Sequence, residues 1–313
     1  MKLLLAALLI FAAQSVCADY PERPVRIVVG MPASSTFPII LRALTAAVPD
    51  SQMQFYLDHK VGQGNLLAYQ NAARSKPDGY TLAFVSTSVV INPLLHDDAG
   101  YSASADFEPV LFLGAVDSGL LAHPSVPFKT VAQLSRYAQK NPGKVSFGHY
   151  GNATQGYLGI LLMADRARSQ FMSVPYSGRG GDAVVTDLFS GTIDLHLIVM
   201  GRVQGHVSTG RVRLLATTGL ARSASFPQVP TVAETYPGYE SIVWYALAAP
   251  RGTPQAVRRK LEAELSAGLS APSTQRALIA IGIEPLAKSP TQAAQFISSE
   301  EKKWGALLSK GRQ

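Results

Sequence analysis

One strand–loop–helix unit near the start of the chain constrains its fold more than any other feature. Residues 25–30 are apolar and β-branched, residues 31–37 are mostly small, and residues 38–48 repeat apolar side chains at helical spacing. Pro38 suits the first turn of a helix, and the residue before a proline is driven out of the α region, so Phe37 is the predicted N-cap. Phe37 has no side-chain oxygen, so the first N–H groups of the helix stay free and can hold an anion. From this stretch alone, an ordinary βα turn with hydrated amides is the favoured alternative.

The same unit recurs further along the chain. A strand at 145–147 leads through a polar loop at 148–155 into a helix at 156–168, and a strand at 172–175 leads through 176–182 into a helix ending at Phe189. Further strands are expected at 53–57, 80–85, 110–115, 119–122, 193–200, 213–217 and 241–248. Further helices are expected at 66–75, 131–141, 202–208, 254–269, 273–281 and 291–308, the second capped by Thr130 with Gln133 three residues on. Strands that alternate with helices predict an α/β fold with mainly parallel sheets.

Ligands of open α/β sheets lie beyond the carboxyl ends of the strands, so the loops at those ends form the candidate site. Two such loops from different sheets, facing each other, would make a cleft lined with amide donors. The candidate ligand-binding residues are Ala33, Ser34, Ser35, Thr36, Phe37, Thr87, Ser88, His149, Gly151, Asn152, Thr154, Gln155, Tyr176 and Arg179.

Several of these candidates have an equally ordinary structural interpretation. The hydroxyls of Thr87 and Ser88 serve more often as helix caps than as ligand contacts. A core imidazole is the favoured alternative for His149. Arg179 can take a carboxylate in two parallel hydrogen bonds, and a solvated loop arginine is the alternative of equal weight.

The N-terminus has the pattern of a secretory signal peptide, residues 1–18. A positively charged start is followed by an apolar run at 3–13 and by small residues before a cleavage site after Ala18. Cleavage there removes Cys17, the single cysteine, so the exported protein needs no disulfide. A lipoprotein acylated at Cys17 is the less favoured alternative, because the residues before it match a lipobox poorly.

The remaining composition excludes several classes of function. A length of 313 residues predicts two domains or one large one, and a formal net charge of +7 favours acidic ligands. The basic residues are scattered, with no run longer than 258–260, so no nucleic-acid partner is expected. No later segment is long and apolar enough to predict a transmembrane helix.

Motifs for catalysis, metals and cofactors are also missing from the sequence. The six histidines never stand at ligand spacing, so no metal site is expected. Residues 178–183 fit a dinucleotide fingerprint only nominally, because Pro175 interrupts the strand before them and no acidic residue follows at the required distance. With no nucleophile paired to a base, neither an enzyme nor a cofactor is expected.

Six strings occur together in an order that resembles one family. They are residues 77–82 (Pro-Asp-Gly-Tyr-Thr-Leu), 91–94 (Ile-Asn-Pro-Leu), 151–154 (Gly-Asn-Ala-Thr), 174–178 (Val-Pro-Tyr-x-Gly), 230–234 (Pro-Thr-Val-Ala-Glu) and 249–254 (Ala-Pro-x-Gly-Thr-Pro). The ordered set resembles the Bug family, the periplasmic receptors of tripartite tricarboxylate transporters. The resemblance runs from Tyr20 to about Trp304.

This resemblance implies a type II periplasmic-binding-protein fold, in which two α/β lobes close on a ligand. The first lobe would comprise residues 19–117 and 245–313, and the second residues 118–244. A small organic anion, a carboxylate, would be the ligand, and subunits of a tripartite tricarboxylate-type membrane transporter would be the partners. A periplasmic monomer is expected.

The chain departs from the family pattern at the ligand loops. Where relatives usually have Pro-Ala-Gly-Gly-x-Thr-Asp, residues 32–38 place Phe37 at the threonine and Pro38 at the aspartate. Asn65 replaces a common glycine, Ile198 replaces a frequent aspartate, and the loop carrying Arg179 looks longer than usual. These changes predict a more electropositive site, with room for an apolar or aromatic ligand body stacked on Phe37. A quite different ligand is the alternative.

Three functions are therefore in competition. The favoured one is a periplasmic receptor for a small organic carboxylate. An orphan binding protein of the same fold, which presents its loaded form to a signalling partner, cannot be separated from it by sequence. An exported α/β enzyme is disfavoured because no catalytic set converges.

Overall fold

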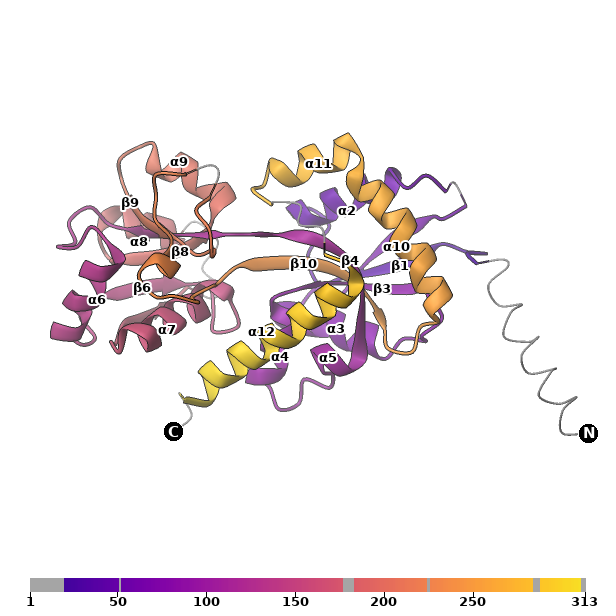
Figure 1. Ribbon diagram of the computed structural model, residues 1–313, viewed down its shortest axis with the longest axis horizontal. Coiled ribbons are helices and arrows are strands. Elements are labelled where there is room, and N and C mark those ends of the chain that lie inside the picture. The colour runs from indigo at the N-terminus through magenta and orange to yellow at the C-terminus, as the bar shows by residue number, and fades with distance from the viewer. Residues whose placement is uncertain (1–19, 51, 177–182, 224–225, 284–287, 311–313) are drawn as a thin grey trace, which may run out of the picture.

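The computed structural model describes residues 20–50, 52–176, 183–223, 226–283 and 288–310. It contains two five-stranded sheets, each covered by helices, at opposite ends of an elongated molecule (Figure 1). We call each sheet with its helices a lobe. The first sheet has the order β2 (Phe55–His59), β1 (Val25–Val29), β3 (Thr81–Ser86), β10 (Val243–Pro250) and β4 (Phe107–Val116). The second has the order β7 (Met172–Pro175), β6 (Ser146–His149), β8 (Leu195–Val199), β5 (Ser118–Ala122) and β9 (Arg213–Thr217).

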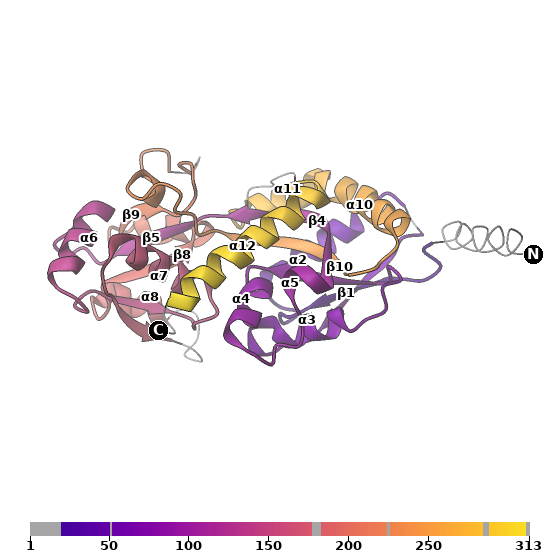
Figure 2. The same cartoon turned by 60° about the horizontal axis from the view of Figure 1, so that its bottom comes forward.

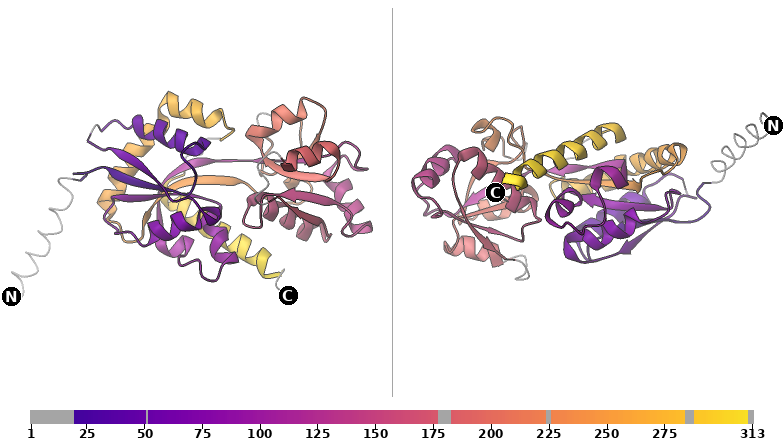
Figure 3. Two further views of the ribbon diagram at one scale, coloured as in Figure 1. Left: turned by 180° about the vertical axis from the view of Figure 1, so that it is seen from behind. Right: turned by 90° about the horizontal axis from the view of Figure 1, so that it is seen from below.

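The chain crosses between the lobes twice. It passes from β4 into β5 at Asp117, and it returns to the first lobe just before β10. Seen from behind, these two crossings run side by side through the middle of the molecule (Figure 3). The α/β class and the two-lobed architecture are therefore confirmed, while the predicted lobe limits at 117/118 and 244/245 stay a proposal.

The prediction of mainly parallel sheets is wrong. β1 pairs in parallel with β2 and β3, but β10 pairs antiparallel with both β3 and β4. The second sheet repeats this arrangement, since β6 pairs in parallel with β7 and β8 while β5 runs antiparallel to β8 and β9. The reason is the return crossing, because β10 inserts between two strands far away in the sequence and local alternation carries no trace of that pairing.

Helices cover both faces of each sheet. In the first lobe they are α2 (Thr36–Ala46), η1 (Gln63–Asn65), α3 (Leu66–Ala73), α4 (Ser88–Leu95), α5 (Ala103–Asp106), α10 (Gln255–Ser270), α11 (Pro272–Ile279) and α12 (Pro290–Lys310). In the second lobe they are α6 (Val131–Lys140), α7 (Gln155–Ala167), α8 (Ala183–Ser190), η2 (Met200–Arg202), α9 (Val203–Val207) and η3 (Val232–Glu234). The helical elements without a prediction from sequence are α4, α5, η1 and η3, and η2 overlaps the predicted helix at Arg202 alone, because Met200 is placed in the preceding strand.

The start of α2 corrects the first prediction. The helix begins at Thr36, and its N-cap is Ser35, whose backbone is extended at φ −76° and ψ 162°. Pro38 therefore occupies the third helical position rather than the first. This is tolerated because the N–H groups of the first turn have no partner within the helix. The first N–H groups of α2 still lack a side-chain cap, as predicted, since Ser35 makes no side-chain cap hydrogen bond.

The C-terminal helix α12 packs on both lobes. It contacts β4, α4 and α5 of the first lobe and α7 of the second, and Figure 2 shows it lying along the junction. Trp244 on β10 is fully buried; its ring stacks on Phe112 with centroids 6.3 Å apart and meets Phe296 on α12 edge to face at 5.8 Å. At the far end of the helix, Lys310 Nζ lies 2.8 Å from Asp165 Oδ1 on α7. The crossing strands therefore share their core with a helix that also touches the second lobe.

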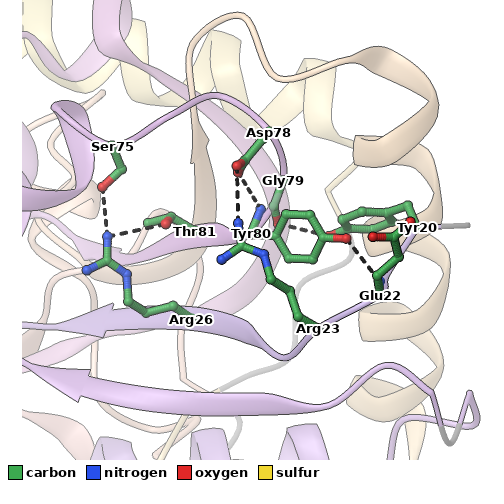
Figure 4. A network of polar contacts seen from close by, with 9 residues as sticks. All are labelled: Tyr20, Glu22, Arg23, Arg26, Ser75, Asp78, Gly79, Tyr80 and Thr81. Carbon is green, nitrogen blue, oxygen red and sulfur yellow. Dashed lines mark hydrogen bonds and ion pairs between the residues drawn. The ribbon is translucent and has the colours of Figure 1, made fainter. Parts of the chain in front are cut away.

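The start of the described chain is tied to the amino end of β3. Tyr20 Oη donates a hydrogen bond to the Gly79 carbonyl at 2.8 Å, and the Glu22 N–H donates to Tyr80 Oη at 2.9 Å (Figure 4). Arg26 on β1 donates to Ser75 Oγ at 2.8 Å. This network occupies the amino-end edge of the sheet and leaves the opposite, carboxyl-end edge to the site. Among the described helices, none is long and apolar enough to cross a membrane.

Candidate ligand-binding site

The carboxyl ends of β2 and β3 in the first lobe face those of β6 and β7 in the second across one cavity of about 1390 Å³. From the first lobe it is lined by Gln63, Asn65, Ser86, Thr87, Ser88 and Asn92, among others. From the second lobe it is lined by His149, Gly151, Asn152, Thr154, Gln155 and Ser173, among others. Loops from two different sheets thus form one cleft.

A hydroxyl cluster forms the first-lobe wall. Ser88 Oγ lies 3.0 Å from Ser86 Oγ and 2.8 Å from Tyr69 Oη, and it accepts a hydrogen bond from Asn65 Nδ2 at 3.1 Å. Burial raises the pKa of Tyr69, so its phenol stays protonated. This hydroxyl cluster is therefore built from neutral groups that can donate hydrogen bonds.

Asn65 reaches this cluster because Gly30, at the end of β1, has no side chain. A Cβ at Gly30 would come within 2.4 Å of Asn65 Oδ1. Asn65 itself has a left-handed backbone, φ 74°, which asparagine tolerates better than most residues. The departure from glycine at Asn65 therefore adds an amide to the cleft wall without a change of backbone shape.

The N-terminus of α7 forms part of the second-lobe wall. Thr154 is its N-cap and accepts a hydrogen bond from the Tyr157 N–H at 3.4 Å, while its own hydroxyl donates to the Gly151 carbonyl at 2.6 Å. The free N–H groups of this first turn and the positive end of the helix dipole favour an anion in the cleft.

Gln155 connects the cleft to the crossing strands. Its side-chain amide donates to Ser241 Oγ at 2.8 Å, just before β10, and its Oε1 accepts from Ser118 Oγ at 3.1 Å, at the start of β5. Gln155 is buried, so each of these bonds replaces a contact with water that the side chain cannot make. A displacement of either crossing strand is therefore transmitted through Gln155 to the wall of the cleft.

His149 lies under the cleft loop with both ring nitrogens engaged. Nδ1 accepts from the Gly151 N–H at 3.1 Å, and Nε2 lies 2.8 Å from Ser173 Oγ. The ring is 1% exposed and packs 4.6 Å from Tyr157. Burial lowers the pKa of His149, so the ring is neutral at neutral pH.

Charge is scarce in the part of the lining that the structure describes. It contains no lysine or arginine, and Asp98 is its one carboxylate. Within the described ranges no cluster of metal-ligating side chains occurs. The predicted positive contribution depended on Arg179, which lies outside the described residues, so the electropositive site stays a prediction.

Half of the predicted site residues meet at this cleft. Thr87, Ser88, His149, Gly151, Asn152, Thr154 and Gln155 line it. Ala33, Ser34, Ser35, Phe37 and Tyr176 are not part of this lining, and the side chain of Thr36 lies outside what the structure describes. Contact of these residues with a ligand stays a prediction.

Phe37 and Tyr176 are placed elsewhere by their own packing. The Phe37 ring lies 4.0 Å from the Tyr245 ring and 5.5 Å from the Phe84 ring, against the core of the first lobe. Tyr176 is buried, and its hydroxyl donates to Asp187 on α8. An aromatic side chain gains more from burial than from exposure at a cleft rim, so the structure does not bring Phe37 to the cleft.

Several lining residues are not among the predicted site residues. Ser86 directly follows a predicted strand, which is where ligands of α/β sheets bind, and Asn65 is noted from sequence as a change in a ligand loop without being named as a ligand contact. Ser173 lies within a strand and Asn92 within a helix that was not predicted, and neither position carries a local signal.

A sequence model described as the tripartite tricarboxylate transporter family receptor matches residues 42–312, most of the chain. The chain belongs to this receptor family. It is also similar to the protein BugT of Bordetella pertussis, with 30% identity over 318 residues, covering 98% of this chain and 97% of BugT. The resemblance to Bug receptors is therefore confirmed.

Solved structures of similar proteins agree with this family. The periplasmic binding protein BugD superposes with a TM-score of 0.73 at 28% identity, covering 93% of this chain and 98% of BugD. A Rhodopseudomonas palustris protein with adipate, Rpa4515, gives 0.75 at 28% identity, covering 93% of this chain and 98% of that one. MatC from the same species, with bound malate, gives 0.74 at 25% identity, covering 92% of this chain and 100% of MatC.

Membership of the family determines the class of function. Tripartite tricarboxylate transporter receptors are periplasmic solute-binding proteins and not enzymes. This agrees with a cleft between two lobes that offers hydrogen-bond donors.

Proposed function

We propose that this protein captures a small organic dicarboxylate in the cleft and delivers it to the membrane subunits of a tripartite tricarboxylate-type transporter. The observation that carries the proposal is that hydroxyls of the first lobe and the α7 N-terminus of the second face one cavity. Adipate and malate, found in two similar proteins, are both dicarboxylates. A dicarboxylate has one charged group for each wall.

Neutral donors suit a receptor that must also release its ligand. Hydrogen bonds to a charged carboxylate are worth about 1.5–3 kcal/mol each, so several of them hold it without a buried cation. A ligand that contacts both lobes binds the closed arrangement better than the open one and shifts the population toward it. The closed form would then be the one that the transporter recognises.

The test is a thermal-shift titration of the purified protein with mono-, di- and tricarboxylates, adipate and malate included. A ligand that binds only the folded state raises Tm, and at 100 times its Kd it adds about 2.7 kcal/mol of stability. The diamides matched to adipate and malate serve as neutral controls. A shift with a neutral solute and none with any acid would overturn the carboxylate assignment.

We also propose that the exported protein is a periplasmic monomer that begins at Asp19, after cleavage behind Ala18. Residues 1–19 lie outside the described part of the chain, so the signal pattern carries this proposal. Intact-mass measurement of the protein from the periplasm separates cleavage at this site from a chain that begins with acylated Cys17. Native mass spectrometry of the same sample reports its oligomeric state and any retained ligand.

A further inference from the structure

His149 and Ser173 form a hydrogen-bonded pair in the second-lobe wall of the cleft that no local sequence pattern predicts. His149 ends β6, Ser173 lies on the neighbouring edge strand β7, and His149 Nε2 is 2.8 Å from Ser173 Oγ. Both residues belong to the cleft lining, but Ser173 is exposed whereas His149 is only 1% exposed. The serine is therefore the member of the pair that a ligand can reach.

The other ring nitrogen decides which atom of the pair carries the hydrogen. Gly151 presents its backbone N–H to His149 Nδ1 at 3.1 Å, and a backbone N–H can only donate. Nδ1 must therefore hold a lone pair. In a neutral imidazole the proton is then on Nε2, so Nε2–H donates to Ser173 Oγ.

The surroundings of the ring keep it neutral. Tyr157 from α7 packs 4.6 Å away, and Phe147 from the same strand 5.5 Å away. Burial lowers the pKa of His149. A neutral ring with Nδ1 unprotonated is the state that satisfies both hydrogen bonds at once.

This arrangement leaves the proton of the Ser173 hydroxyl available. A hydroxyl has one proton and two lone pairs, and His149 uses only a lone pair. With the opposite tautomer, Ser173 would donate to the ring and would offer a ligand lone pairs alone. Among the described residues, His149 is the hydrogen-bond partner of the Ser173 side chain. Accepting one hydrogen bond also polarises the O–H and strengthens it as a donor.

We propose that Ser173 is a ligand-binding residue whose hydroxyl donates to a carboxylate oxygen of the ligand, and that His149 is the positioning residue that keeps this proton available. The inference rests on the proposed function, because it names a contact within the same cleft. It also defines a preference: the ligand group at Ser173 is an acceptor oxygen.

The same geometry separates this pair from a catalytic one. A serine Oγ within hydrogen-bond reach of a histidine is what a nucleophile and its general base also show. Here Nε2 already carries a proton and has no lone pair with which to take the proton of Ser173. The pair therefore binds rather than reacts, in agreement with the family.

The binding test uses adipate and malate as probes in isothermal titration of the full chain. Ser173→Ala is expected to weaken the affinity for whichever probe binds by about tenfold or more, the loss of one hydrogen bond to a charged oxygen. Ser173→Thr keeps a hydroxyl on an edge strand and should retain most of the affinity. Ser125→Ala is the matched control, because Ser125 Oγ lies 2.7 Å from His123 Nδ1 in a second His–Ser pair outside the cleft.

The tautomer is tested without any ligand. Long-range ¹H–¹⁵N correlation spectra of labelled protein, assigned by the signals lost in His149→Gln, should show a protonated Nε2 and an unprotonated Nδ1. A protonated Nδ1 in the neutral ring, or unchanged affinity in Ser173→Ala, would overturn the inference and leave the proposed function intact. If the unaltered protein binds no carboxylate, the proposed function fails, and with it the ligand contact of Ser173.

Discussion

His149 shows how one residue type supports two interpretations until its neighbours are known. In sequence it stands in a polar loop after a strand, where a ligand contact is a reasonable expectation. In the structure its ring is buried, and both nitrogens are bonded to other parts of the second lobe. Its effect on a ligand is thus exerted through Ser173 and Gly151, its hydrogen-bond partners in the same cleft lining.

A residue-scale prediction concerns pH. Burial lowers the pKa of His149 below the ordinary value of 6.5 that applies in the unfolded chain. As pH falls below 6.5, the unfolded chain takes up a proton at this histidine before the folded protein does, so the free energy of unfolding decreases. Well above pH 6.5 the histidine is neutral in both states, and nothing is lost. Urea unfolding midpoints measured from pH 7.5 down to pH 5 should decrease.

The control for this prediction is a pair of histidine variants. His149→Gln should flatten the decrease between pH 6.5 and pH 5, whereas His123→Gln, at the surface pair with Ser125, should keep it. Equal pH dependence in the original protein and in His149→Gln would contradict the assignment to His149.

Two helices of the second lobe begin in the same way but serve different purposes. Thr130 caps α6 by accepting from the Gln133 N–H at 3.2 Å, and Thr154 caps α7 by accepting from the Tyr157 N–H at 3.4 Å. The first cap lies on the surface, and the second lies in the wall of the cleft. The cap of α6, which begins in solvent, contributes to stability alone. The first turn of α7 also faces the ligand site.

An element-scale prediction separates these purposes. Thr130→Ala should lower the free energy of unfolding by about 1 kcal/mol and leave ligand affinity unchanged. Thr154→Ala should cost a similar amount of stability and also weaken the binding of adipate or malate. Chemical unfolding and calorimetric titration of both variants measure the two effects, and equal affinity in the two variants would count against α7 as part of the ligand site.

The two lobes touch at more than their crossing strands. α12 reaches α7 on one side, and on another the turn after α11 meets η2 of the second lobe. There the backbones approach so closely that a Cβ at Gly201 would come within 2.2 Å of the Ile281 carbonyl oxygen. Since the atom in the way belongs to the backbone, a side chain at Gly201 must displace the turn after α11 from η2.

A whole-molecule prediction follows for Gly201→Ala. Overpacking of this kind costs about 1–3 kcal/mol, so the variant should separate the lobes, enlarge the radius of gyration in X-ray scattering and weaken ligand affinity by about tenfold. Gly205→Ala, in the adjacent helix α9, is the matched control, because a Cβ there meets nothing within 4 Å. Identical scattering and affinity in the two variants would show that this contact does not influence the lobe arrangement.

Much of the local structure was readable in the residues themselves. The strands at 172–175 and 213–217 were predicted with the limits that the structure shows, and the cap at Thr130 was predicted from its spacing to Gln133. Alternation, capping and turn chemistry depend on a few neighbouring residues, so a short stretch of sequence is enough to predict them. The six ordered strings that resemble the family also predict the two-lobed α/β fold.

The site depended on contacts that span the chain. The Trp244 N–H donates to Thr87 Oγ1, Gln155 bonds to Ser241, and β10 runs antiparallel to β3, all between segments far apart in sequence. Phe37 packs against Phe84 and Tyr245 in the first lobe and not at the cleft. Ser173 is proposed as a ligand contact because His149 is its hydrogen-bond partner. The residues therefore specified which local elements form and what kind of cleft to expect. Tertiary packing alone selected the side chains that face it, because burial and pairing depend on neighbours that no local pattern encodes.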